Sequence, residues 1–305
     1  MISNSNKFLI FLTLLAMATL SGCISQDQPQ PSALSDNTSD NASDNAQENA
    51  TDKINVATTI APLAEFVRAV GGDRVAVTVV VPPGAEPHTF EPTPSLMVDM
   101  SKADLYVMNG AGLEFWIDRL LQANKDMTVI DSSKGIDLIS ESEDEMDPHI
   151  WISLKNAAVQ VQNICSGLIQ VDPANKDYYS QNRDSYLEQL KALDEELNSS
   201  FTASKKKIFV VHHPAWTYFA RDYALEQVPL MENEKEPGPK YLSQVIDLAR
   251  QNNITTVFIE PEFNPKSAEV IAREMNASIT TLDPLAGDYL NNMRYAGRAI
   301  ASSLN

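Results

Sequence analysis

The chain has 305 residues, 43% of them hydrophobic, and its 41 acidic and 23 basic side chains give a formal net charge of −18. This acidic balance disfavours nucleic acid as a partner and suits the attraction of cations. The length allows two domains of ordinary size beyond a short amino-terminal region.

The pattern of residues 1–22 predicts an export signal peptide. Lys7 precedes an apolar run, residues 8–20, which ends in Leu20-Ser21-Gly22-Cys23. A basic start, small residues at the end and a run too short for a membrane span of about 20 residues are typical of such a signal. The final four residues resemble the lipobox of prokaryotic lipoproteins, which implies that Cys23 carries lipid; the alternative is an ordinary signal peptide with an incidental cysteine.

Residues 23–53 predict a disordered linker, lipid-anchored at Cys23. They are mainly Ser, Asn, Asp, Gln and Ala, and so bury too little apolar surface to offset the entropy of ordering. The three Asn-x-Ser/Thr triplets in this tract, at Asn37, Asn41 and Asn49, arise easily by chance, so they establish neither glycosylation nor the host. We therefore expect an extracytoplasmic protein anchored to the cell membrane.

Residues 54–172 predict a first α/β lobe. The runs 54–58, 75–81 and 105–108 are typical of buried strands, and the runs 62–70, 94–102 and 114–123 have helical periodicity. Alternation of strands and helices predicts a mainly parallel sheet flanked by helices. Cys165 lies in an apolar-periodic stretch and is expected to pack in the core.

Residues 173–203 predict one long helix that joins this lobe to the next. The helix follows Asp172-Pro173, and its apolar or aromatic positions recur at helical spacing: Tyr179, Tyr186, Leu190, Leu193 and Leu197. A helix of this length spans about 40 Å, and such a connector limits hinge motion. A coiled-coil stalk would need a longer and more even apolar seam.

Residues 204–305 repeat the pattern and predict a second α/β lobe. Strand-like runs occupy 208–211, 256–259 and 279–282, and helix-like runs occupy 216–223, 240–251, 267–275 and 289–302. The predicted fold class is therefore α/β, with two lobes joined by one long backbone helix.

Candidate metal ligands follow the predicted strands of the first lobe. His88 lies in a turn just after the run 75–81, and His149 follows the acidic loop 141–147 and precedes Ile150-Trp151-Ile152. Loops at the carboxyl edge of parallel sheets converge on ligand sites. His88 alone could be an ordinary surface-loop histidine. The acidic loop is either a solvated segment or a means of raising the local cation concentration.

The second lobe offers two adjacent histidines and two carboxylates. His212 and His213 end the run 208–211, and side chains alternate along a strand, so only one of them is expected to join a site, with the other in support. Glu260 and Asp283 each end a strand-like run and precede a proline. The pattern does not rank these two carboxylates.

Five motifs in order resemble the zinc and manganese solute-binding proteins of ABC importers, the ZnuA/TroA-like cluster. They are Pro87-His88-Thr89-Phe90-Glu91-Pro92, Asp147-Pro148-His149-Ile150-Trp151, the segment from His213 to Phe219, Ile259-Glu260-Pro261-Glu262-Phe263, and Leu282-Asp283-Pro284-Leu285. The resemblance covers the chain from Ile54 onward. It implies a metal site between the lobes.

By motif, the resemblance implies that His88, His149, His213 and Asp283 bind the metal, with Glu260 near the site and His212 in support. It also implies an ABC permease and its ATPase as partners of a monomeric binding protein. The acidic loop 141–147 occupies the place of a histidine-rich loop in zinc-binding members but contains no histidine, which disfavours a metal-collecting role.

Three imidazoles and one carboxylate favour Zn²⁺ in a near-tetrahedral shell, whereas carboxylate-rich shells suit Mn²⁺. Manganese-type members usually have a carboxylate where this chain has His213. The prediction is a zinc-binding protein without enzymatic activity. Alternatives are a Mn²⁺ or Fe²⁺ solute-binding protein, a metal-binding adhesin involved in cell adhesion, and a zinc hydrolase, which the absence of an HExxH motif disfavours.

Overall fold

The structure, a computed structural model, describes residues 53–142, 145–231 and 238–305. The predicted signal peptide, the lipidation site Cys23 and the linker up to residue 52 lie outside the described residues.

The first lobe is built on a four-stranded sheet in the order β2-β1-β3-β4, and every neighbouring pair is parallel. The strands are β1 (Ile54–Thr58), β2 (Val75–Val79), β3 (Leu105–Met108) and β4 (Thr128–Asp131). The helices are α1 (Ala61–Gly71), α2 (Pro94–Met100), α3 (Ile117–Ala123) and α4 (Leu154–Val171). Sequence patterning missed β4, because all four of its side chains are only half-buried and the strand lacks a continuous apolar run.

The second lobe repeats this winding with the order β6-β5-β7-β8, again with parallel pairs throughout. The strands are β5 (Ile208–Val211), β6 (Glu226–Pro229), β7 (Thr256–Ile259) and β8 (Ser278–Thr281). The helices are α6 (Thr217–Asp222), α7 (Pro239–Gln251), α8 (Lys266–Met275) and α9 (Tyr289–Ser303). Edge strand β6 was also missed in the sequence, since it is polar and partly exposed.

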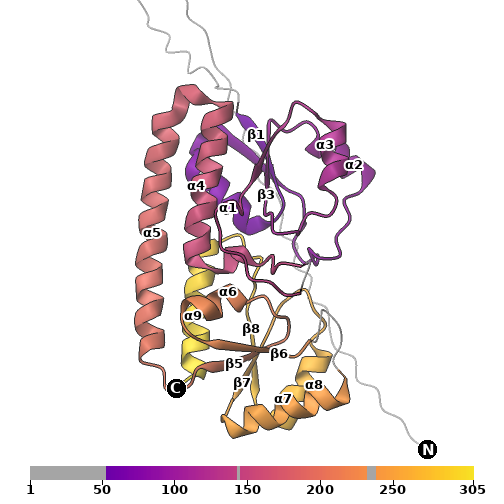
Figure 1. The fold of residues 1–305 in the computed structure, drawn as a ribbon, viewed down its shortest axis with the longest axis vertical. Coiled ribbons are helices and arrows are strands. Elements are labelled where there is room, and N and C mark those ends of the chain that lie inside the picture. The colour runs from indigo at the N-terminus through magenta and orange to yellow at the C-terminus, as the bar shows by residue number, and fades with distance from the viewer. Residues whose placement is uncertain (1–52, 143–144, 232–237) are drawn as a thin grey trace, which may run out of the picture. The chain divides into compact units, whose positions relative to one another are not determined.

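Helix α5 (Lys176–Thr202) joins the lobes and contacts both of them. It packs beside α1 and α4 of the first lobe and beside α9 of the second (Figure 1). At Gly297 of α9 a Cβ would lie 2.5 Å from a methyl group of Leu197, so glycine permits the close approach of the two helices. Across the part of the chain that the structure describes, no helix has both the length and the apolarity needed to cross a bilayer.

The larger hydrophobic core is continuous through both lobes. Phe66 of α1 packs edge-on against Tyr289 of α9 with ring centroids 4.7 Å apart, and Tyr186 of α5 lies 6.0 Å from Phe66. A smaller core fills the space between α7, α8 and the second sheet. The arrangement confirms the predicted fold class and holds the carboxyl ends of both sets of strands next to a shared interface.

Candidate metal centre

The histidines lie beyond the carboxyl ends of strands in both lobes. His88 lies in the loop after β2, and His149 precedes a single 3-10 turn (Ile150–Ile152) that leads into α4. His212 and His213 directly follow β5. In each sheet the chain adds its second strand on one side of the first strand (β1 or β5) and its third strand on the other side. Parallel α/β sheets form ligand crevices at such a reversal of strand order.

Three of the histidines converge through their Nε2 atoms. The Nε2 atom of His149 lies 3.1 Å from that of His88 and 3.1 Å from that of His213. A tetrahedral ion with bonds of about 2.0–2.1 Å separates its ligand nitrogens by about 3.3 Å. Both distances from His149 are therefore close to that separation, and the ligand atoms of all three imidazoles lie within 4.8 Å of one another.

The three histidine side chains differ in their exposure to solvent. His149 and His213 are buried, whereas the side chain of His88 is 24% exposed. His88 is therefore the solvent-facing member of the three.

Asp147 orients His149. Its Oδ1 atom lies 2.8 Å from Nδ1 of His149 and also accepts a hydrogen bond from the backbone nitrogen of His149 at 2.8 Å. Burial by itself raises the pKa of Asp147, but the hydrogen bond and the charge of His149 outweigh it and leave the pKa below its ordinary value. An ionised carboxylate at Nδ1 keeps the proton there, so Nε2 presents its lone pair to the centre.

We expect Asp147→Asn to weaken zinc binding by about 10–100-fold, because the amide neither fixes the tautomer nor raises the basicity of His149. The affinity is measured by competition with a chromophoric chelator. Asp126→Asn, an exposed change in the same lobe, serves as the control and should leave the affinity unchanged. Equal affinities for Asp147→Asn and wild type would contradict this role.

Glu260 and His212 lie beside the three histidines rather than among them. Glu260 is 1% exposed; its Oε2 atom accepts a hydrogen bond from the backbone nitrogen of His213 at 3.4 Å, and burial raises its pKa to about 8. The backbone nitrogen of His212 donates to Phe258, and its ring lies 5.1 Å from that of Phe263. Within the described residues, neither side chain contributes an atom to the three-histidine group.

Asp283 lies in an adjoining cavity of about 440 Å³, which shares Glu262 and Leu285 with the small cavity around the histidines. Its Oδ1 atom accepts a hydrogen bond from the backbone nitrogen of Leu285 at 2.8 Å, and burial raises its pKa. Among the described residues, two groups have ligand atoms within 4.8 Å of one another: His88, His149 and His213, and Glu141, Asp147 and His149; Asp283 belongs to neither. The structure thus brings together three of the four predicted ligands.

The segment that carries His149 is held by the second lobe. The Tyr218 hydroxyl donates to the carbonyl of Asp147 at 2.8 Å, and the indole nitrogen of Trp151 donates to the carbonyl of Pro284 at 2.7 Å. The Tyr289 hydroxyl donates to the carbonyl of Trp151 at 2.6 Å. These bonds hold His149 of the first lobe next to His213 of the second, and sequence reasoning assigned no role to Tyr218 or Tyr289.

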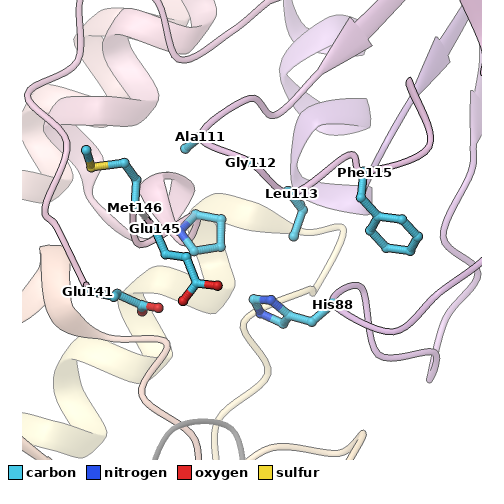
Figure 2. Close-up of a pocket in the computed structure, with 9 residues that line it drawn as sticks. His88, Ala111, Gly112, Leu113, Phe115, Glu141, Glu145 and Met146 are labelled. Atoms are coloured by element: carbon cyan, nitrogen blue, oxygen red, sulfur yellow. The ribbon is translucent and has the colours of Figure 1, made fainter. Parts of the chain in front are cut away.

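A cavity of about 560 Å³ opens onto His88. Figure 2 shows the carboxyl groups of Glu141 and Glu145 on one side of this cavity and the His88 imidazole on the other. The described part of the acidic loop therefore lies at the mouth of the centre, where its charge favours cations over anions.

Comparisons with known proteins identify the family of this chain. The family model described as "ZnuA: Zinc-uptake complex component A periplasmic" matches residues 56–303. The chain is 33% identical to the high-affinity zinc uptake system protein ZnuA of Bacillus subtilis over 257 residues, covering 77% of this chain and 80% of that protein. It is 31% identical to the manganese-binding lipoprotein MntA of Halalkalibacterium halodurans over 231 residues, covering 74% and 77%. A crystal structure of ZnuA superposes with a TM-score of 0.81 at 39% identity, covering 83% of this chain and all of that one.

Proposed function

Because this chain belongs to the family of the zinc-uptake component ZnuA, whose members include metal solute-binding proteins of ABC transporters, we propose that it captures Zn²⁺ between its lobes and delivers it to an import permease. We further propose that the mature protein acts outside the cytoplasm as a monomer, anchored to the membrane by lipid on Cys23. Its partners are then the permease and the associated ATPase.

One observation carries the choice of zinc: three imidazole Nε2 atoms, from both lobes, lie within coordinating reach of one point. Zinc favours nitrogen ligands in a four-coordinate shell, and harder cations favour oxygen. The proposed ligands are His88, His149, His213 and Asp283, with Asp283 completing the shell when its carboxylate turns from Leu285 toward the histidines. Glu260 and His212 support the loop that carries His213.

The proposal assigns no catalysis to the chain. A catalytic zinc keeps one position open for water and has a general base beside it. With Asp283 in the shell, that position is closed. Manganese is the second candidate cargo, since the relative MntA is named as manganese-binding.

The metal preference is tested on the purified mature protein after removal of metal with a chelator. The protein is offered Zn²⁺, Mn²⁺ and Fe²⁺ at equal concentrations and desalted, and its bound metal is then quantified. We expect one zinc ion per chain. A metal-free protein, or one loaded mainly with manganese or iron, would contradict the zinc proposal. For delivery, cells that lack the chain should accumulate less labelled zinc than cells that carry it.

A further inference from the structure

A tight turn after β7 places an additional carboxylate at the centre. The backbone nitrogen of Phe263 donates to the carbonyl of Glu260 at 3.4 Å and closes the turn Glu260-Pro261-Glu262-Phe263. The ring of Phe263 stacks on that of His213, with centroids 5.1 Å apart and an interplanar angle of 28°. Glu262 is therefore held between two residues that both contact His213.

Glu262 borders both cavities of the centre. It lines the small cavity together with His88, His149 and His213, and it lines the adjoining cavity together with Asp283. Its position is thus intermediate between the three imidazoles and the carboxylate that the family resemblance assigns to the metal.

One oxygen of the Glu262 carboxylate lacks a hydrogen-bond donor. Its Oε2 atom is buried, and within the described residues nothing donates a hydrogen bond to it. Burial raises the pKa of Glu262, and a hydrogen bond from its own backbone nitrogen lowers it in part. The carboxylates of Asp283 and Glu86 raise this pKa, and His213 lowers it. A carboxylate with such an oxygen, close to two other carboxylates, is unfavourable in its ionised form unless a cation lies nearby.

We propose that Glu262 is a further metal-binding residue of this centre, which joins the three histidines and Asp283 when the bound ion is larger and harder than zinc. Three nitrogens and two carboxylates then surround the ion, a shell that suits Mn²⁺. This inference rests on the proposed function, because it assigns a broader cargo to the same site. Zinc, satisfied by four ligands, does not need Glu262.

The test compares Glu262→Gln with wild type. The amide keeps the size of the side chain and removes its charge, and Glu269→Gln, an exposed change on the neighbouring helix α8, is the matched control. Zn²⁺ and Mn²⁺ affinities are titrated separately against competing chelators. We expect Glu262→Gln to weaken Mn²⁺ binding about tenfold or more and Zn²⁺ binding less than about threefold, while Glu269→Gln changes neither.

Glu262→Asp provides a second variant should the amide disturb folding, as judged by circular dichroism. It keeps the charge but withdraws the carboxylate by one methylene, and it should weaken Mn²⁺ selectively as well. An unchanged ratio of Mn²⁺ to Zn²⁺ affinity in both variants, or a wild-type protein that binds zinc but no manganese, would overturn the role of Glu262. Failure of the wild-type protein to bind either metal would instead overturn the proposed function.

Discussion

Replacement of His149 by alanine is expected to weaken zinc binding by about 10²–10³-fold. Structural zinc sites with four ligands contribute about 10–16 kcal/mol, so one ligand accounts for about 3–4 kcal/mol. His149 is the member whose Nε2 atom is 3.1 Å from both of the others, and its loss leaves His88 and His213 without their shared neighbour. The dissociation constant is measured by chelator competition.

The same variant provides a second readout through protein stability. A ligand at about 1,000 times its dissociation constant stabilises the folded state by about 4 kcal/mol, so micromolar zinc should raise the melting temperature of a wild-type protein with nanomolar affinity. At the same zinc concentration His149→Ala should show little or no rise.

His212→Ala is the matched control for His149→Ala. Like His149, His212 is a buried histidine, but it follows β5 and lies outside the three-histidine group. We expect a smaller loss of zinc affinity than in His149→Ala, because the His212 side chain contributes no atom to the three-histidine group. Equal losses in the two variants would contradict the assignment of the three ligands.

Glu114→Gln is expected to remove a pH dependence of about 3 kcal/mol from the free energy of unfolding. Glu114 is 4% exposed and accepts hydrogen bonds from the backbone nitrogens of Asn109 at 2.7 Å and Gly110 at 3.0 Å, and from the hydroxyl of Thr59 at 2.5 Å. Burial raises its pKa from 4.5 to about 7, although these hydrogen bonds lower it in part.

The sign follows from proton binding. Between pH 4.5 and 7 the folded state holds a proton on Glu114 that the unfolded state has lost, so the stabilisation is complete below pH 4.5 and is lost as pH rises through about 7. At about 1.36 kcal/mol per pKa unit, the total is about 3 kcal/mol. Urea unfolding with a chelator present, from pH 4.5 to 8, should show a steeper decline for wild type than for Glu114→Gln. Parallel curves would show that Glu114 does not titrate in this range.

Glu114 also connects folding stability to the metal centre. It fixes the turn at Asn109, and the side-chain nitrogen of Asn109 donates to the carbonyl of Pro148 at 2.8 Å, directly before His149. Ser132 and Gln160 extend this buried network, since the Ser132 hydroxyl donates to the carbonyl of Asn109 and accepts from the side chain of Gln160. The loop that carries His149 is therefore held from the first lobe as well as from the second.

Sequence patterning predicted the central elements well. β1, β3, β5 and β7 are short apolar runs, and they were found at their observed bounds because central strands of a parallel sheet are buried on both faces. The helical spacing of buried residues from Tyr179 to Leu197 likewise revealed α5. β4 and β6 were missed because edge strands need no continuous apolar run.

The sequence by itself determined that histidines follow strands in both halves of the chain, since local periodicity shows where strands end. Only the tertiary structure decided that His213 rather than His212 meets His149, that Asp147 holds the His149 ring, and that Glu262 stands beside the histidines while Asp283 lies in the adjoining cavity. Alternation along a strand shows that neighbouring side chains diverge but not which of them faces the site. That choice depends on how the two lobes pack, through contacts between residues far apart in the chain such as Tyr218 and Asp147.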